Sequence, residues 1–83
     1  MLFRSSFKLI PNPTRDYIKF ISNSNNSKYS LNIYTNDGKF IMKINNVSNG
    51  ENIDLSKLDK GQYIISIFLR EVFTGNNIKL IKY

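Results

Sequence analysis

The sequence predicts a single all-β domain, built as a sandwich or barrel of short strands. Runs rich in Ile, Tyr, Phe and Leu alternate with clusters of Asn, Ser, Gly and Asp, which is the pattern of strands separated by turns. No stretch shows the sustained 3.6-residue apolar period of a helix. The length of 83 residues fits one domain, and 41% hydrophobic residues are enough to fill one small core.

Seven strands follow from these runs, and side-chain alternation gives most of them an inward face. They span residues 7–10, 16–22, 29–35, 39–44, 52–55, 63–72 and 78–82. In the second strand Ile18 and Phe20 share a face, and in the third Leu31 and Ile33 do so. The sixth strand is the longest and has apolar residues on both faces, which indicates a central strand covered on both sides.

Turn chemistry predicts where these strands are connected. Pro11-Asn12-Pro13 ends the first strand, because proline has no ladder donor and restricts the residue before it to extended conformations. Asp37-Gly38 lies between two apolar runs, which is a strong hairpin signal. Residues 74–77 read as the last turn, while 23–28 and 45–50 are polar loops.

The segment between the fifth and sixth strands is expected to form a single helical turn over residues 56–60. That turn directs Leu58 into the end of the core. Gly61 then supplies a left-handed backbone conformation that other residues resist. Tyr63 combines an apolar ring with a polar tip, which suits the edge of the core.

Composition argues against an enzyme. The chain has no Cys and no His, so the usual nucleophile–base pairs and most transition-metal sites are missing. Most of the six acidic residues lie beside turn residues, where Asp caps or turns the backbone. We therefore predict no catalytic residue, no metal and no cofactor.

The formal net charge of +6 comes from scattered lysines and arginines. This distribution favours a solvated surface that protects strand edges over a phosphate-binding face. No run approaches the roughly 20 apolar residues of a transmembrane helix, so no membrane insertion is expected. Residues 1–7 lack the apolar segment of a signal peptide.

Four segments in fixed order carry a family resemblance. They are Leu9-Ile10-Pro11-Asn12-Pro13-Thr14, Leu31 through the Asn36-Asp37-Gly38 turn to Lys39, Ile53 through Leu58 and Gly61 to Tyr63 and Ile67, and the basic terminus Ile78-Lys79-Leu80-Ile81-Lys82. Together they resemble the C-terminal sorting domain of the type IX secretion system, in its type A form. The resemblance covers residues 7–83 and makes 1–6 a linker remnant.

The resemblance implies an immunoglobulin-like β-sandwich of about seven antiparallel strands. It implies a non-catalytic C-terminal signal that directs an N-terminal cargo from the periplasm of a Gram-negative bacterium through the outer-membrane translocon. A sortase-like peptidase then removes the signal, and the cargo stays on the cell surface or outside the cell. Without a signal peptide of its own, the chain is expected to be the end of a larger protein or a short orphan reading frame.

The residues expected to be read by the translocon are those of the terminal strand: Ile78, Lys79, Leu80, Ile81, Lys82 and Tyr83. A free edge strand at that position suits docking by β-augmentation. The family residues expected to act mainly structurally are Pro11, Asn12, Pro13, Asp37, Gly38, Leu58, Gly61 and Tyr63.

Two other functions are open to a small β domain. A fibronectin-like or carbohydrate-binding accessory module needs a planar row of exposed aromatics, for which Tyr17, Tyr34 and Phe73 are the candidates. A nucleic-acid module of the OB type needs lysines and aromatics gathered on one sheet face. The sorting signal is favoured over both, and no nucleic acid is expected as a partner.

Overall fold

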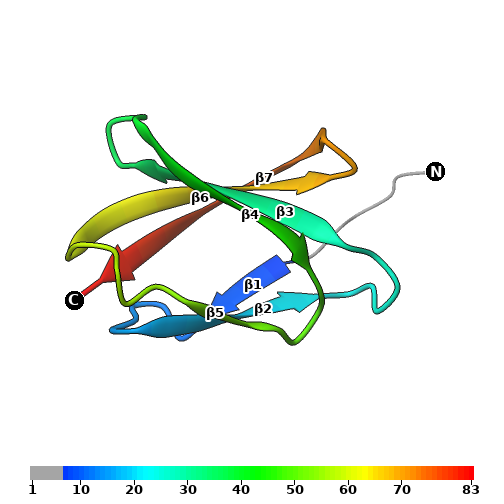
Figure 1. Cartoon of the computed structure of the whole chain (residues 1–83), viewed down its shortest axis with the longest axis horizontal. Coiled ribbons are helices and arrows are strands. Elements are labelled where there is room, and N and C mark those ends of the chain that lie inside the picture. The colour runs from blue at the N-terminus through cyan, green and yellow to red at the C-terminus, as the bar shows by residue number, and fades with distance from the viewer. Residues whose placement is uncertain (1–6) are drawn as a thin grey trace.

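Two antiparallel sheets lie face to face and enclose one core (Figure 1). The computed structural model describes residues 7–83; the predicted linker remnant, 1–6, lies outside the described residues. One sheet has the order β1 (Phe7–Ile10), β2 (Tyr17–Ser22), β5 (Asn52–Asp54), and the other has the order β4 (Phe40–Val47), β3 (Tyr29–Thr35), β6 (Gly61–Leu69), β7 (Val72–Lys82). The predicted all-β sandwich of seven strands is confirmed.

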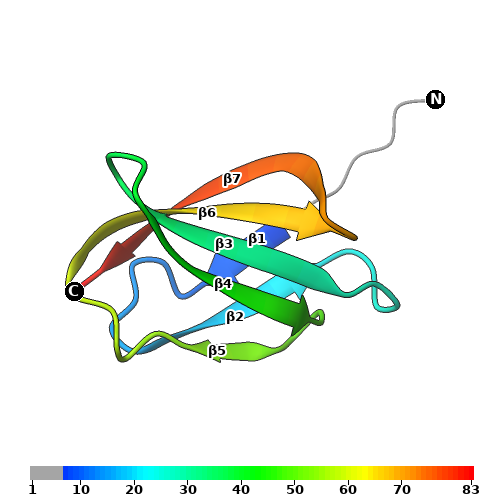
Figure 2. The ribbon, with the colours of Figure 1, turned by 45° about the horizontal axis from the view of Figure 1, so that its top comes forward.

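The strand order is immunoglobulin-like. Strands 1, 2 and 5 face strands 3, 6 and 7, and β4 extends the sheet of β3. Figure 2, a second view of the domain, shows the two sheets again, with β1, β2 and β5 on one side and β3, β4, β6 and β7 on the other. Within residues 7–83 no helix is long and apolar enough to cross a membrane.

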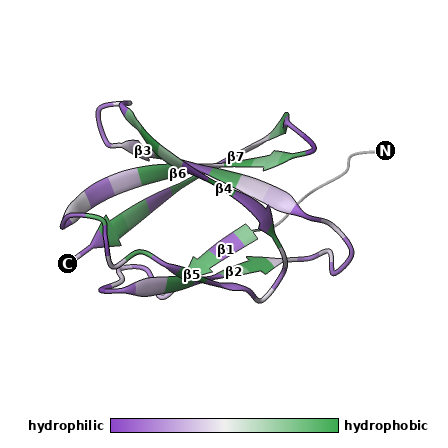
Figure 3. Cartoon of the chain, in the orientation of Figure 1, coloured by the Kyte–Doolittle hydropathy of each residue, from purple (hydrophilic) through white to green (hydrophobic). Residues whose placement is uncertain are grey.

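The core lies between the sheets and is filled by alternate side chains of both. Ile18 and Phe20 from β2 and Leu31 and Ile33 from β3 are completely buried, as the alternation predicted. The remaining buried apolar residues are Leu9, Tyr29, Val47, Ile53, Leu55, Tyr63, Ile65, Ile67 and Leu80. Figure 3 shows the corresponding bands of hydrophobic and hydrophilic residues along the strands, with largely hydrophilic loops.

The β3–β4 hairpin forms where Asp37-Gly38 predicted it. Gly38 has a φ of 95°, and the Thr35 amide donates to the Lys39 carbonyl at 2.8 Å. This is a three-residue loop that ends in a positive-φ glycine. β4 then continues to Val47, so the predicted loop over 45–50 begins three residues late. Val47 is buried in the core, while Asn45 and Asn46 before it stay exposed.

The predicted last turn over residues 74–77 is wrong. The chain reverses at Arg70-Glu71, whose φ angles are 52° and 66°, and β7 runs on from Val72. Thr74-Gly75 instead forms a bulge in the ladder between β6 and β7, where the Thr74 hydroxyl donates to the Ile67 carbonyl at 2.7 Å. Because Arg and Glu rarely adopt positive φ, local sequence gave no turn signal there.

Residues 56–60 form turns rather than the predicted helical turn. The Leu58 amide donates to the Leu55 carbonyl at 3.0 Å, which closes a tight turn. Leu58 packs against the core as expected. Gly61 has a positive φ of 153°, which residues with a side chain rarely adopt, as the sequence predicted.

The predicted central strand is β6, which lies between β3 and β7. Its inward residues Tyr63, Ile65 and Ile67 are buried, but Ile64 and Phe68 on the outer face are only half-buried. The expected second cover on that face is therefore absent among residues 7–83.

Candidate recognition surface

The four family motifs lie at one end of the sandwich. Consecutive antiparallel strands alternate in direction, so the loops after β1, β3 and β5 fall at the same end as the last residues of β7 (Figures 1 and 2). These loops carry Pro11-Asn12-Pro13, Asp37-Gly38 and the 55–60 turn. Motifs spread over most of the sequence therefore lie at the same end of the sandwich, here called the motif end.

The terminal strand divides its side chains between core and solvent. Leu80 is fully buried and Lys82 is 8% exposed, whereas Ile81 and Tyr83 are 40% and 55% exposed. Lys79 is also exposed, and Ile78 is half-buried. Because successive side chains point to opposite faces, only Lys79, Ile81 and Tyr83 are presented outward.

Asn12 binds the edge of this strand with its side chain. Its Nδ2 donates to the Lys79 carbonyl at 2.7 Å, and its Oδ1 accepts from the Ile81 amide at 3.1 Å. A carboxamide places a donor and an acceptor side by side, as a neighbouring strand would. Pro11 and Pro13, both preceded by cis peptide bonds, flank it and are exposed.

Thr14 continues the same contact with its backbone. Its amide donates to the Ile81 carbonyl at 2.8 Å, and its carbonyl accepts from the Tyr83 amide at 3.0 Å. The pairing is a parallel bridge between Thr14 and Lys82. Thr14 is itself buried, and its hydroxyl donates to the Tyr17 carbonyl.

Together Asn12 and Thr14 form an edge bracket on β7 from Lys79 to Tyr83. The expectation of a free terminal edge is therefore wrong, because residues 67 to 69 positions earlier in the chain occupy it. β-augmentation at this stretch requires displacement of the bracket. The sequence predicted only a local role for Pro11-Asn12-Pro13, as the end of the first strand, because nothing nearby in the chain specifies so distant a partner.

The β5–β6 turn is fastened by Tyr63. Its hydroxyl donates to the Asp59 carbonyl at 2.6 Å, and only 6% of the residue is exposed. Burial, with a smaller effect of the nearby Asp59 charge, raises the pKa of Tyr63 above its ordinary value. On the same turn the Ser56 amide donates to Asp54 Oδ1 at 2.9 Å, which lowers the pKa of Asp54.

Asp37 has a structural role at the tip of the β3–β4 hairpin. The Thr35 hydroxyl donates to its carboxylate, and the same hydroxyl accepts from the Lys39 amide at 3.0 Å. The Thr35 hydrogen bond is the main reason that the pKa of Asp37 lies below its ordinary value. These bonds fix the turn and leave the side chain at the surface.

The residues considered for other functions do not come together. Tyr17 lies on the three-stranded sheet, while Tyr34 and Phe73 lie on the four-stranded sheet, at strands separated by β6. They cannot form one planar row for a sugar. Among residues 7–83 there is also no cluster of three His, Cys, Asp or Glu side chains able to hold a metal ion.

The fold and its motif end define a small immunoglobulin-like β-sandwich whose sequence motifs lie at the end where the bracketed terminal strand finishes. The family model described as "Secretion system C-terminal sorting domain" matches residues 8–80. The chain belongs to this family, the C-terminal sorting domain of the type IX secretion system. A search of the curated proteins found no match.

Proposed function

We propose that this domain is a non-catalytic signal whose motif end is read by the outer-membrane translocon, so that an attached N-terminal cargo is exported. Family membership over residues 8–80 is the observation that carries the proposal. It makes the chain a C-terminal sorting signal and implies export to the cell surface or beyond. Passage through the periplasm and removal by a sortase-like peptidase complete the proposal.

The outward side chains of β7 are the proposed contact. Lys79, Ile81 and Tyr83 give the translocon one cation and two apolar groups on a strand held by the edge bracket. The inward residue Leu80 acts differently, since it is fully buried. Its truncation to Ala costs about 2–5 kcal/mol of stability, and any effect on export follows from unfolding.

Deleting residues 77–83 is a poor test of this proposal. The deletion removes β7 partners of β6 from Gly61 to Ser66 and both hydrogen bonds of Asn12. A truncated fusion that stays inside the cell is then equally explained by misfolding. Surface substitutions separate recognition from folding.

The test is a reporter with an N-terminal export signal, followed by residues 1–83, in a type IX-competent cell. We expect Lys79→Ala, Ile81→Ser and Tyr83→Ser in combination to abolish surface display while the purified domain keeps its unfolding midpoint. Lys82 is left unchanged, because its burial makes it part of the structure. Normal display of the triple variant would show that these side chains are not read.

A matched control lies on the opposite edge of the same sheet. Phe40, Ile41 and Lys43 on β4 are exposed and offer the same chemistry: one aromatic, one aliphatic and one cationic side chain. Phe40→Ser, Ile41→Ser and Lys43→Ala together should leave display intact. If the control variant loses surface display to the same extent as the β7 triple variant, general surface polarity rather than the terminal strand governs export.

A further inference from the structure

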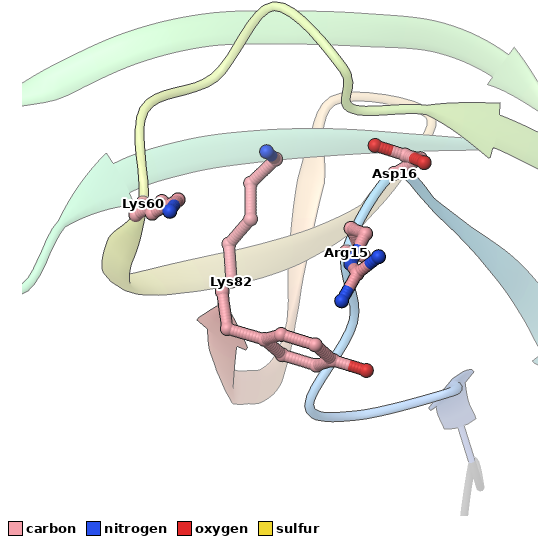
Figure 4. A pocket seen from close by; sticks show the side chains of 5 residues that line it. Arg15, Asp16, Lys60 and Lys82 are labelled. Atoms are coloured by element: carbon pink, nitrogen blue, oxygen red, sulfur yellow. The ribbon is translucent and has the colours of Figure 1, made fainter.

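The motif end contains a hollow of about 430 Å³ in which three cationic side chains meet. Its lining is Arg15, Asp16, Lys60, Lys82 and Tyr83. Figure 4 shows the Lys82 side chain running between Lys60 on one side and Arg15 and Asp16 on the other. These residues come from the segment after the edge bracket, the end of the 55–60 turn and the end of β7.

Lys82 is the unusual member of this group. It is 8% exposed, yet its ammonium makes no hydrogen bond or ion pair with any residue from 7 to 83. A lysine can bury its aliphatic stem and keep its charged end in water. Here, however, Lys82 lines the same hollow as Arg15 and Lys60. The hollow gathers three cationic side chains with the single side-chain carboxylate of Asp16, and such an excess of like charge is unfavourable without a further counter-ion.

We propose that this hollow is a binding site for a phosphate group. Its lining side chains, three cations and the Asp16 carboxylate, carry a net charge of +2, and the α-carboxylate that ends the 83-residue chain at Tyr83 lowers this to +1. A phosphate monoester carries about −1.5 to −2 at pH 7 and has three acceptor oxygens, so it can accept from all three cations at once, whereas a carboxylate has only two oxygens. The lysine ammoniums supply rotatable donors that suit phosphate oxygens.

Arg15 and Tyr83 shape one wall of the site. The guanidinium carbon of Arg15 lies 5.4 Å from the centre of the Tyr83 ring, a cation–π contact that restricts the arginine. The edge bracket fixes Tyr83 through its backbone bond to Thr14. The hollow is therefore assembled by the same contacts that hold the terminal strand.

The experiment follows the backbone amides of the 83-residue chain by NMR during titration with inorganic phosphate, with sodium chloride of equal ionic strength as the reference. We expect saturable shifts confined to Arg15, Asp16, Lys60, Lys82 and Tyr83. Lys82→Met keeps the stem and removes the charge, and should weaken binding by about tenfold or more, as expected for a charge-assisted contact. If it fails to fold, the exposed Lys60→Met carries the test.

Lys43→Ala on β4 is the matched control, because it removes the same charge far from the hollow; its affinity should stay within about twofold of the wild type. The proposal is overturned if phosphate acts no differently from chloride, or if Lys82→Met and Lys60→Met bind as the wild type does. Stronger competition by acetate than by phosphate also overturns it. None of these readouts involves the secretion machinery, so the site and the export proposal can fail independently.

The source of the phosphate is decided by three further probes. Tighter binding of glucose 6-phosphate than of inorganic phosphate, with no binding of glucose, supports a phosphorylated soluble molecule. Sedimentation of the wild type but not Lys82→Met with vesicles of phosphatidylglycerol and phosphatidylcholine supports a lipid headgroup. If inorganic phosphate binds more tightly than glucose 6-phosphate and than the vesicles, the ligand is the free phosphate ion.

Discussion

Replacing Asn12 by Ala tests whether the edge bracket holds the terminal strand. The substitution removes the bonds to the Lys79 carbonyl and the Ile81 amide, at 2.7 and 3.1 Å. A typical intramolecular hydrogen bond contributes about 0.5–1.5 kcal/mol net. Because both lie at the exposed surface, where water can replace them, we place the loss at about 1–2 kcal/mol rather than at the full sum.

Thermal unfolding followed by tyrosine signals measures this loss. In a domain of this size 1 kcal/mol lowers Tm by about 4–8 °C. Amide hydrogen exchange supplies a local readout, because the Ile81 amide loses its acceptor and should exchange faster. Asn26→Ala, an exposed asparagine in the 23–28 loop, should change neither quantity.

Asn12→Asp distinguishes the donor from the acceptor. The carboxylate can still accept from the Ile81 amide but opposes the Lys79 carbonyl, so at neutral pH the variant should be no more stable than Asn12→Ala. Protonation restores a donor, so its deficit should shrink as the pH falls below about 4. Unchanged Tm and unchanged Ile81 exchange in Asn12→Ala would refute the bracket.

Two further predictions concern the β6–β7 hairpin and the pH dependence of stability. Arg70→Asn with Glu71→Gly should raise stability by about 1–2 kcal/mol, because φ angles of 52° and 66° strain ordinary residues; a lower Tm would contradict this. Asp37 and Asp54 have pKa values below the ordinary 3.8 in the folded state. Their contribution to stability is therefore complete above about pH 3.8, and it is lost as the pH falls through their folded pKa values. Tyr63 has a pKa above the ordinary 10.0 in the folded state, so its contribution to stability is complete below about pH 10.0 and is lost as the pH rises through its folded pKa. The free energy of unfolding, measured with urea, should therefore be constant between about pH 5 and pH 9.

The structure changes how the family motifs are understood. Asn12 looks like a corner residue in the sequence, but in the fold it is bonded to the last strand of the domain. The terminal strand is therefore displayed in a fixed register rather than as a loose end. The fold places Lys79, Ile81 and Tyr83 on one outward face, an arrangement that an unfolded chain would not hold.

Sequence reasoning succeeded where the governing interaction is local. Alternation placed Ile18, Phe20, Leu31 and Ile33 in the core, because a pleated strand must direct every second side chain to the same face. Asp37-Gly38 located a hairpin, because few other pairs tolerate its backbone angles. The prediction failed at the Arg70-Glu71 turn, where strand pairing imposes positive φ angles that these residues do not prefer.

An all-β fold, the inward residues of its central strands and the family could be predicted from the sequence alone, because these depend on side-chain alternation, turn chemistry and motif order along the chain. The folded structure was needed to show that Asn12 covers the edge of β7 and that Arg15, Lys60 and Lys82 line one hollow. Those contacts join residues from three separate segments, and they exist only after strand register and sheet packing are fixed. No single stretch of the chain specifies the strand register or the packing of the two sheets.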